Sequence, residues 1–320
     1  MNILKGYLLV AMCILLFAHC EKENNNNETT ANGNLRLEMT DAPSDDANIR
    51  GVFVTIAEVK VDGKTFEGFN GKKTIDVKAY QNGKVEALGL GALETGTYSN
   101  ITVVLDYDTD ANGNAPGCYV LTANNQKEAL ASASASATQE IKSTGTFVIN
   151  ENDETDIVLD FDLRKAVRYE NQEQQDYSFA TQAELSSAVR LVEKEKSGHV
   201  KGNCDDNVSN SEMIVVYAYT KGSYDKNSEL SGQGNSNITF ANAETSAAVD
   251  ANGNYQLSFL TAGDYELVFA SYEDEDNDGQ FELKGTLQLN ALTNLSLLGV
   301  SVEAQSETTI DVVVTGILPL

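Results

Sequence analysis

"LTAGDYELVFASYEDEDNDG", residues 260–279, places a strand pattern directly before a run of acidic residues. The part from Asp264 to Tyr272 is rich in aromatic and branched apolar residues, which favour β-strands. Gly263 and Tyr265 suit a tight entry turn and an aromatic anchor over a sandwich core. The first half repeats this order in "LETGTYSNITVVLDYDTDANG", residues 93–113. We therefore expect the two halves to share one broad architecture.

Short β-branched or alternating runs recur along the whole chain between turns rich in Gly, Asn and Asp. Three Asn-Gly dipeptides, beginning at Asn82, Asn112 and Asn252, favour tight hairpin turns. This pattern predicts an all-β chain with two antiparallel β-sandwich domains of immunoglobulin or transthyretin-like type. The predicted domains are residues 34–196 and 197–320.

One segment, "TQAELSSAVRLVEK" at residues 181–194, carries a helical signal. Thr181 and Glu184 have the spacing of a capping box, and the apolar residues from Leu185 to Val192 fit one helical face. The segment is either a helix, or a single capped turn followed by a strand that enters the second domain. We favour the second interpretation.

The first twenty residues, "MNILKGYLLVAMCILLFAHC", predict a secretory signal peptide. Their apolar run from Tyr7 to Ala18 is too short to span a bilayer comfortably. Leu16 to Cys20 resembles a bacterial lipoprotein cleavage box, in which Cys20 is acylated. His19 stands where a small residue is usual, so a soluble secreted protein is the alternative. The Asn-rich residues 21–33 predict a disordered tether.

A lipid on Cys20 predicts a cell-envelope protein anchored to the outer membrane, and the charged residues Glu21 to Glu23 favour its surface face over the periplasmic one. Without the signal, 21 basic residues stand against 48 acidic ones, a formal charge of −27. Nucleic acid as a partner requires a basic surface and is therefore excluded. Cys118 and Cys204 either form a disulfide in an oxidising compartment or remain free thiols.

Several motifs of the first half resemble a bacterial family known as domain-of-unknown-function family 4382. They are Thr40-Asp41-Ala42-Pro43 after the first strand, and Leu159 to Asp162 followed by Arg164 and Lys165. The resemblance covers about residues 34–195. It implies an exported β-sandwich, often on a lipid anchor, with no established activity.

The second half is similar to transthyretin-like and carboxypeptidase-regulatory-like sandwiches. "GHVKGNC" at residues 198–204 and the Gly-x-Tyr strand before the acidic turn carry this resemblance. It implies a structural or spacer module, sometimes sugar binding, and seldom catalysis.

The acidic turn matches part of a calcium-binding loop. Asp274, Asp276 and Asp278 occupy positions one, three and five; Gln280 and Glu282 follow at seven and nine. Position twelve is a Gly instead of a bidentate Glu, which predicts weak structural binding of Ca²⁺; the alternative is a solvated acidic turn. A weaker second site of the same kind is predicted from Asp108, Asp110, Asn112 and Asn114.

Catalytic motifs are scarce. His199, in a predicted turn, is the one histidine outside the signal, and neither a Gly-x-Ser-x-Gly nor a His-Glu-x-x-His motif occurs. The chain has no Trp for stacking on sugars; Tyr217 and Tyr219 alternate on one strand, either facing a glycan or lying at the edge of a half-buried strand. We therefore expect a non-catalytic envelope lipoprotein that binds a protein or glycan. The alternative is a carbohydrate-binding or carbohydrate-active protein that uses acidic residues.

Overall fold

The computed structural model describes residues 31–42, 48–130, 132, 136–171, 176–276, 280–292 and 297–320. The predicted signal peptide, Cys20 and residues 21–30 of the tether lie outside these ranges, as do Pro43 and Asp278. Within them, none of the helices combines the length and the apolar character that crossing a membrane requires.

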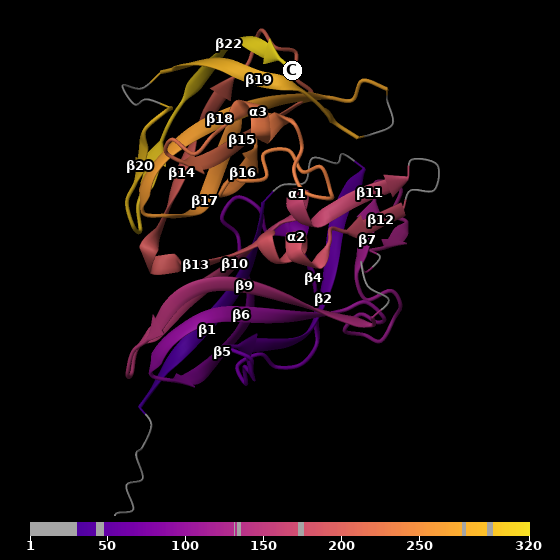
Figure 1. The fold of residues 1–320 in the computed structure, drawn as a ribbon, viewed down its shortest axis with the longest axis vertical. Helices are drawn as coiled ribbons and strands as arrows, with labels where there is room; N and C mark the ends of the chain where they lie inside the picture. Colours follow the sequence, from indigo (N-terminus) through magenta and orange to yellow (C-terminus); the bar gives the residue numbers. More distant parts are fainter. Residues whose placement is uncertain are drawn as a thin grey trace, which may run out of the picture. The chain divides into compact units, whose positions relative to one another are not determined.

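The first half of the described chain consists of two sheets that face each other (Figure 1). One sheet has the strand order β13-β10-β1-β5, and the other has β8-β7-β2-β6-β9 with β3 and β4 also paired to β2. The strands are β1 (Asn32–Ala42), β2 (Ile49–Val61), β3 (Lys64–Thr65), β4 (Lys73–Asp76), β5 (Glu86–Glu94), β6 (Gly96–Asp106), β7 (Tyr119–Thr122), β8 (Lys127–Ala129), β9 (Thr138–Ile149), β10 (Glu154–Asp162) and β13 (Val189–Glu193), with a 3-10 turn η1 (Val77–Ala79).

The two sheets share one hydrophobic core. Leu37 of β1 and Leu159 of β10 belong to the same buried cluster as Val54 of β2, Val103 of β6 and Phe147 of β9. Burial of this apolar surface on both inner faces is the main driving force for a sandwich. The predicted all-β sandwich is thus confirmed for this half.

β10 is buried on both faces, because its alternate side chains pack against two different parts of the protein. Ile157, Leu159 and Phe161 enter the sandwich core, while Val158 packs with Phe259 of the second half. Asp160 and Asp162 follow Val158 at the same period of two, so they share its face. The sequence places two carboxylates on a buried face, and such groups require partners.

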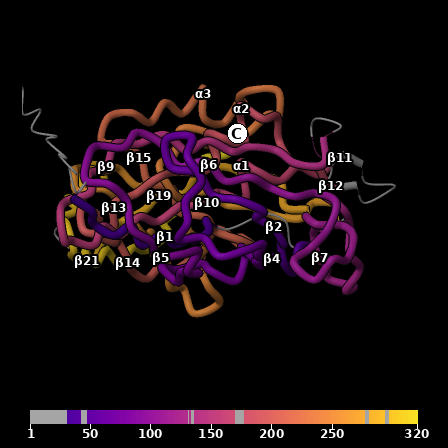
Figure 2. Tube along the Cα trace, turned by 90° about the horizontal axis from the view of Figure 1, so that it is seen from below, coloured from indigo at the N-terminus to yellow at the C-terminus, as the bar shows by residue number. Residues whose placement is uncertain are grey.

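Strand pairing in the first half differs from the antiparallel prediction in one respect; in the second half, the strand Ser197–Asp205 also runs parallel to Glu307–Thr309 and to Val312–Pro319. Most pairs are antiparallel, but β1 runs parallel to β10, from Asn34 opposite Glu154 to Ala42 opposite Asp162. Figure 2 shows β1 between β5 and β10. A parallel pair needs a long crossover between its strands, and here the other sheet provides it.

The segment between β10 and the second half is short and mixed. It contains α1 (Leu163–Ala166), the hairpin β11 (Val167–Asn171) and β12 (Asp176–Phe179), α2 (Gln182–Ser187) and a 3-10 turn η2 (Lys194–Lys196). Thr181 and Glu184 form the complete capping box of α2, which ends before β13 begins. The favoured interpretation, one capped turn followed by a strand, is confirmed.

The second half forms one curled sheet with the order β16-β15-β18-β19-β22-β14-β17, to which β20 and β21 add at β18 and β14. Val200 of β14, Leu257 of β17, Val216 of β15 and Phe269 of β18 share one core, so the two ends of the sheet face each other as a sandwich. The elements are β14 (Ser197–Asp205), β15 (Met213–Thr220), α3 (Lys226–Leu230), β16 (Thr245–Ala248), β17 (Asn254–Thr261), β18 (Gly263–Glu273), β19 (Glu282–Ala291), β20 (Val300–Val302), β21 (Glu307–Thr309) and β22 (Val312–Pro319).

The predicted limits need one correction. β1 begins at Asn32, so the last residues of the predicted tether belong to the sheet. Gly33 lies so close to the backbone that an added Cβ would be 2.1 Å from the carbonyl oxygen of Asn150, which only glycine allows. The domain boundary at residues 196 and 197 stays a prediction. At this point the chain leaves the sheets of the first half and begins to pair with strands of the second half.

Candidate functional site: the seam between the two halves

The two sequence motifs of the first half lie side by side. The parallel register of β1 and β10 sets Thr40 opposite Asp160, Asp41 opposite Phe161 and Ala42 opposite Asp162. These strand ends face residues 236–259 of the second half. We call this contact the seam; it consists of Asp160, Asp162, Arg164, Lys165, Glu184, Arg190 and the groups that they bind in residues 236–259.

Cations from α1 bind backbone carbonyls across the seam. Arg164 donates from Nη2 to the carbonyl oxygen of Phe240 at 3.2 Å, and from Nη1 to that of Thr239. Lys165 donates from Nζ to the carbonyl oxygen of Ala243 at 2.7 Å. These carbonyls belong to an irregular loop outside the strand ladders. The two side chains supply hydrogen bonds to the carbonyl oxygens of Thr239 and Ala243, and a second one to that of Phe240, which also accepts the backbone N–H of Ala243 at 3.2 Å.

Asp162 holds both cations in place. Its Oδ2 lies 3.1 Å from Nη2 of Arg164 and 3.4 Å from Nζ of Lys165, and Oδ1 accepts the backbone N–H of Lys165. Burial alone would raise the pKa of Asp162, but the two cations outweigh it and lower this pKa. Asp162 is therefore an ionised, structural carboxylate.

A second ion pair lies beside the first. Arg190 of β13 donates from Nη2 to Asp160 Oδ2 at 2.6 Å and from Nη1 to the carbonyl oxygen of Phe259 at 2.8 Å. Thr245 of β16 donates its hydroxyl to the same Asp160 oxygen at 3.3 Å. Both motif carboxylates thus connect a first-half cation with second-half backbone or hydroxyl groups.

Glu184 joins the seam without a cation. Ser236 donates its N–H to Oε1 at 3.0 Å and its hydroxyl to Oε2 at 2.6 Å, while Thr181 donates to Oε2 at 2.7 Å. Desolvation opposes ionisation, but these hydrogen bonds prevail and lower the pKa of Glu184 to about 2. The capping box at the start of α2 therefore also binds the second half.

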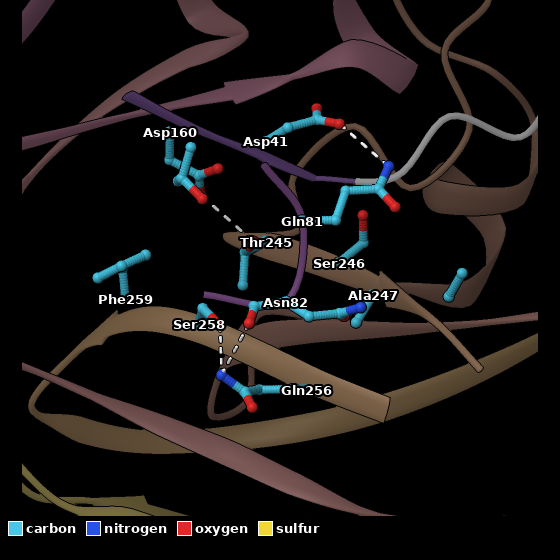
Figure 3. A pocket seen from close by; sticks show the side chains of 12 residues that line it. Asp41, Gln81, Asn82, Asp160, Thr245, Ser246, Ala247, Gln256, Ser258 and Phe259 are labelled. Carbon is cyan, nitrogen blue, oxygen red and sulfur yellow. Dashed lines mark hydrogen bonds between the residues drawn. The ribbon is translucent and has the colours of Figure 1, made fainter. Parts of the chain in front are cut away.

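Two cavities border the seam. One of about 300 Å³ is lined by Asp160, Asp162, Lys165 and Arg190, whose charges are already paired with one another. The other holds about 30 Å³ and lies between Asp41 and β16 (Figure 3). A space of this size admits one water molecule and no sugar ring.

The acidic turn presents carboxylates to solvent. Oxygen atoms of Asp274, Asp276 and Glu282 all lie within 4.8 Å of one another, so the turn brings three of the predicted ligands together. Glu212 lies nearby, since its Oε2 accepts the N–H of Asp274 at 3.1 Å. Gln280 is half-buried, and Asp278 lies outside the described residues.

The second predicted metal site is a hydrogen-bonded turn. Oδ1 of Asp110 accepts the N–H groups of Asn112 and Asn114 at 2.9 and 2.8 Å, an arrangement that closes the loop without an ion. The same five residues, Asp-Ala-Asn-Gly-Asn, recur at 250–254, where Asp250 accepts the N–H groups of Asn252 and Asn254 at 2.8 Å each. The structural counterpart of this turn is therefore residues 250–254. Asp108 contributes its own N–H to Asp106.

Cys118 and Cys204 are free thiols in the structure, which is the second of the two predicted alternatives. Both are buried, Cys118 in the core of the first half and Cys204 in that of the second. Because each thiol lies in a different hydrophobic core, the two are not joined. Burial raises the pKa of each to about 12, so neither is a reactive thiolate at neutral pH.

Three other sequence interpretations change. His199 lies in β14 instead of a turn, with its Nδ1 3.4 Å from the N–H of Phe259. Tyr217 and Tyr219 are fully buried and face no glycan. Tyr217 stacks on Phe240 with ring centroids 4.0 Å apart, beneath the guanidinium of Arg164, so it supports the seam.

Comparison with known families supports the first-half assignment. Residues 32–180 match the family described as "Domain of unknown function (DUF4382)". The resemblance carried by the Thr-Asp-Ala and Leu-Asp-Phe-Asp motifs is thus confirmed. Comparison with curated proteins finds no match.

Solved structures offer weak similarities. The Bacillus anthracis TIE protein is 13% identical, with a TM-score of 0.20. The match covers 88% of this chain, which spans only about a third (34%) of the length of the TIE protein. The minor pilin GBS52 of Streptococcus agalactiae is 10% identical, covers 89% of this chain and 97% of its own, and has a TM-score of 0.21. The major pilin BcpA of Bacillus cereus is 11% identical with a TM-score of 0.19, covering 88% and 70%. At these values the similarities carry no argument about function.

Proposed function

We propose that this protein is a non-catalytic, lipid-anchored scaffold or binding module of the cell envelope, with its two halves held as one unit. The seam supports the proposal: Arg164, Lys165 and Arg190 all bind backbone carbonyls of the second half. A module of this kind displays its outer surfaces at a fixed mutual position for a protein or glycan partner. Its charge of −27 without the signal keeps nucleic acid off that surface.

The paired state of the seam carboxylates argues against hydrolysis of glycans there. A glycosidase needs one carboxyl group as acid and a second as nucleophile or base, with the substrate between them. Asp160 and Asp162 are both bound to cations, so neither carboxylate is free to act as acid, base or nucleophile in the 300 Å³ cavity that both of them line. The 30 Å³ cavity beside Asp160 is too small for a sugar.

Carbohydrate binding without catalysis is the second candidate. An open groove of about 480 Å³ is lined by amide and charged groups, among them Asn82, Lys201, Asn203 and Asn254. The aromatic residue in its lining, Tyr255, is buried and donates its hydroxyl to the carbonyl oxygen of Ile310 at 2.6 Å. A groove of this kind would bind sugars through hydrogen bonds without ring stacking.

A glycan array and a reducing-sugar assay on the purified chain distinguish these functions. The proposal expects no sugar release by the wild type. Catalytic release that Asp160→Asn abolishes would overturn it, while array binding lost in Asn203→Ala with an unchanged melting temperature would favour the second candidate.

The lipid anchor is tested separately. We expect labelled palmitate to enter the wild type and Cys20→Ala to leave the protein in the soluble fraction, since acylation is the proposed attachment. Cys118→Ala serves as the control and should label normally. Absence of label from the wild type would contradict the anchor and favour a soluble secreted protein.

Calcium remains part of the proposal in a structural role. The mutual approach of Asp274, Asp276 and Glu282 supports it, because a divalent cation would remove the repulsion among them. Asp110, whose carboxylate already accepts backbone N–H groups, supports a second site less.

A further inference from the structure

The small cavity at the seam is lined mostly by polar residues. It lies where the end of β1 meets β16 and β17, and Figure 3 shows the side chains that surround it. Its volume of about 30 Å³ exceeds the roughly 10–15 Å³ that one water molecule requires. The lining residues are Thr40, Asp41, Gln81, Asn82, Asp160, Thr245, Ser246, Ala247, Ala248, Gln256, Ser258 and Phe259.

Two buried oxygen atoms of this lining have no hydrogen-bond partner among the residues that the structure describes. They are Oδ1 of Asp41 and Oγ of Ser246. Asp41 is 6% exposed and Ser246 is 4% exposed, so bulk water does not solvate them freely. An unsatisfied buried polar atom costs about 1–3 kcal/mol. Both of these atoms belong to residues that line one water-sized cavity, so a water molecule bound there is the simplest partner for them.

The other oxygen of Asp41 has a neutral partner. Gln81 donates its side-chain N–H to Oδ2 at 3.1 Å. None of the ion pairs between described residues includes Asp41. An ionised Asp41 would therefore be a buried charge without a cation, which is strongly unfavourable.

The charges that face Asp41 come from the neighbouring strand and oppose its ionisation. β10 presents Asp160 and Asp162, and their cations, Arg190 with Arg164 and Lys165, are bound to those two carboxylates. β16 and β17 line the cavity with uncharged groups, namely Thr245, Ser246, Gln256 and Ser258. Burial first, and then the two carboxylates, raise the pKa of Asp41 well above its usual value, and they outweigh the side chain of Gln81 and the backbone N–H of Leu163, which lower it.

We propose that Asp41 is a neutral carboxylic acid at physiological pH, that its Oδ1–H donates to one buried water, and that this water donates to Oγ of Ser246. This arrangement satisfies both orphan atoms and places no unpaired charge in the seam. It binds the family motif Thr40-Asp41-Ala42 to β16 of the second half. Raising the pH ionises Asp41 and loosens this contact.

The expected pH dependence has a definite sign. In the unfolded chain an Asp ionises near pH 3.9, whereas the folded chain keeps the proton to a higher pH. The contribution to stability is complete below about pH 3.9 and is lost as pH rises toward the folded pKa. Asn keeps a donor at the same place and cannot ionise, so Asp41→Asn should remove this loss.

The test compares melting temperatures of wild type, Asp41→Asn and the control Asp264→Asn from pH 4 to pH 8. Asp264 is exposed, and in the described part of the chain its carboxylate takes part in no side-chain hydrogen bond, so its variant should follow the wild type. We expect the melting temperature of Asp41→Asn to rise by a few degrees relative to that of the wild type between pH 4 and pH 8. Ser246→Ala, which removes the acceptor, should lower the melting temperature at pH 4.

Carbon-13 NMR of labelled Asp carboxyl groups measures the protonation state in the wild type itself, without any substitution. One resonance in the position of a neutral carboxylic acid at pH 7 supports the proposal, and its absence overturns it. A melting temperature that rises with sodium or calcium in wild type but not in Asp41→Asn would also overturn it, since the cavity would then hold a cation beside an ionised Asp41.

Discussion

Asp160 and Asp162 at the seam are buried, and each has an Arg nitrogen within 3.1 Å. In the acidic turn Asp276 and Glu282 are exposed, and the ion pair beside them joins Lys284 to Glu273. Both regions are rich in carboxylates, but only the first must neutralise them on folding, because water solvates the second.

Buried carboxylates therefore help to specify how the two halves pack, whereas exposed carboxylates are only tolerated by the fold. A buried carboxylate can be accommodated only where its cation arrives in the right geometry, so the seam pairs favour one mutual position of the two halves. An exposed carboxylate adds repulsion that salt screens and that a bound cation can remove. We therefore expect substitutions at the seam to affect stability strongly and substitutions in the turn to act weakly.

The largest effect is expected for Arg164→Ala. It leaves the buried Asp162 with one cation and removes the side-chain donors to the carbonyl oxygens of Thr239 and Phe240, of which the second keeps the N–H of Ala243. Breaking a buried pair in this way costs about 3–5 kcal/mol. Urea unfolding should show this loss, and calorimetry should show the single transition of the wild type divide into two as the halves unfold separately.

Arg36→Ala is the matched control. Arg36 binds Glu154 at 2.7 Å, but both side chains are more than a third exposed, so the loss should stay below about 1 kcal/mol. Equal losses in the two variants would remove the distinction between the seam and an ordinary surface pair.

Local patterns in the sequence predicted the local structure correctly. The Gly-x-Tyr repeat is real: Tyr98 and Tyr265 each donate their hydroxyl to the carbonyl oxygen four residues earlier, at 2.8 and 2.6 Å. The capping box of Thr181 and Glu184 and the strand after it also followed from residues within one short segment. Such features depend on neighbours in the chain, which a sequence displays directly.

The seam could not be predicted in this way, because it depends on the parallel pairing of β1 with β10, more than a hundred residues apart. One signal was present: Asp160 and Asp162 alternate with Leu159 and Phe161 in a strand that is otherwise apolar. Carboxylates on the second face of a buried strand predict a partner surface, although not which one. Tyr217 misled for the same reason, since it is covered by Phe240, which lies far from it in the sequence. Tyr219 is buried in the same cluster, where it donates its hydroxyl to Glu229 at 2.8 Å.

A smaller effect is expected for Glu184→Gln, which tests a seam carboxylate that has hydroxyl and N–H partners instead of a cation. The variant should lose about 1 kcal/mol at pH 7, as for other helix caps. The folded pKa of about 2 lies below the unfolded value near 4.3, so this stability is present above pH 4.3 and disappears as pH falls toward 2. Urea unfolding at pH 7 and pH 3 should show the difference between variant and wild type shrink.

Glu151→Gln, at an exposed position, is the control for this measurement and should match the wild type at both pH values. If the loss of unfolding free energy in Glu184→Gln were the same at pH 7 and pH 3, the negative charge of Glu184 would contribute nothing to stability. The hydrogen bonds from Ser236 would then stabilise the ionised carboxylate no more than the neutral side chain.

The smallest effect is expected in the acidic turn, where a bound calcium ion would remove the repulsion among the carboxylates. With a dissociation constant on the order of 10⁻³ M, about 10 mM calcium stabilises the folded chain by about 1.4 kcal/mol, or a rise of a few degrees in melting temperature. The double variant Asp274→Asn, Asp276→Asn should melt slightly higher than wild type in chelator, because two like charges are gone, and should not respond to calcium. Glu151→Gln should respond like the wild type. An unchanged wild-type melting temperature would show that the turn is solvated, and that Asp274, Asp276 and Glu282 lie together because water permits it.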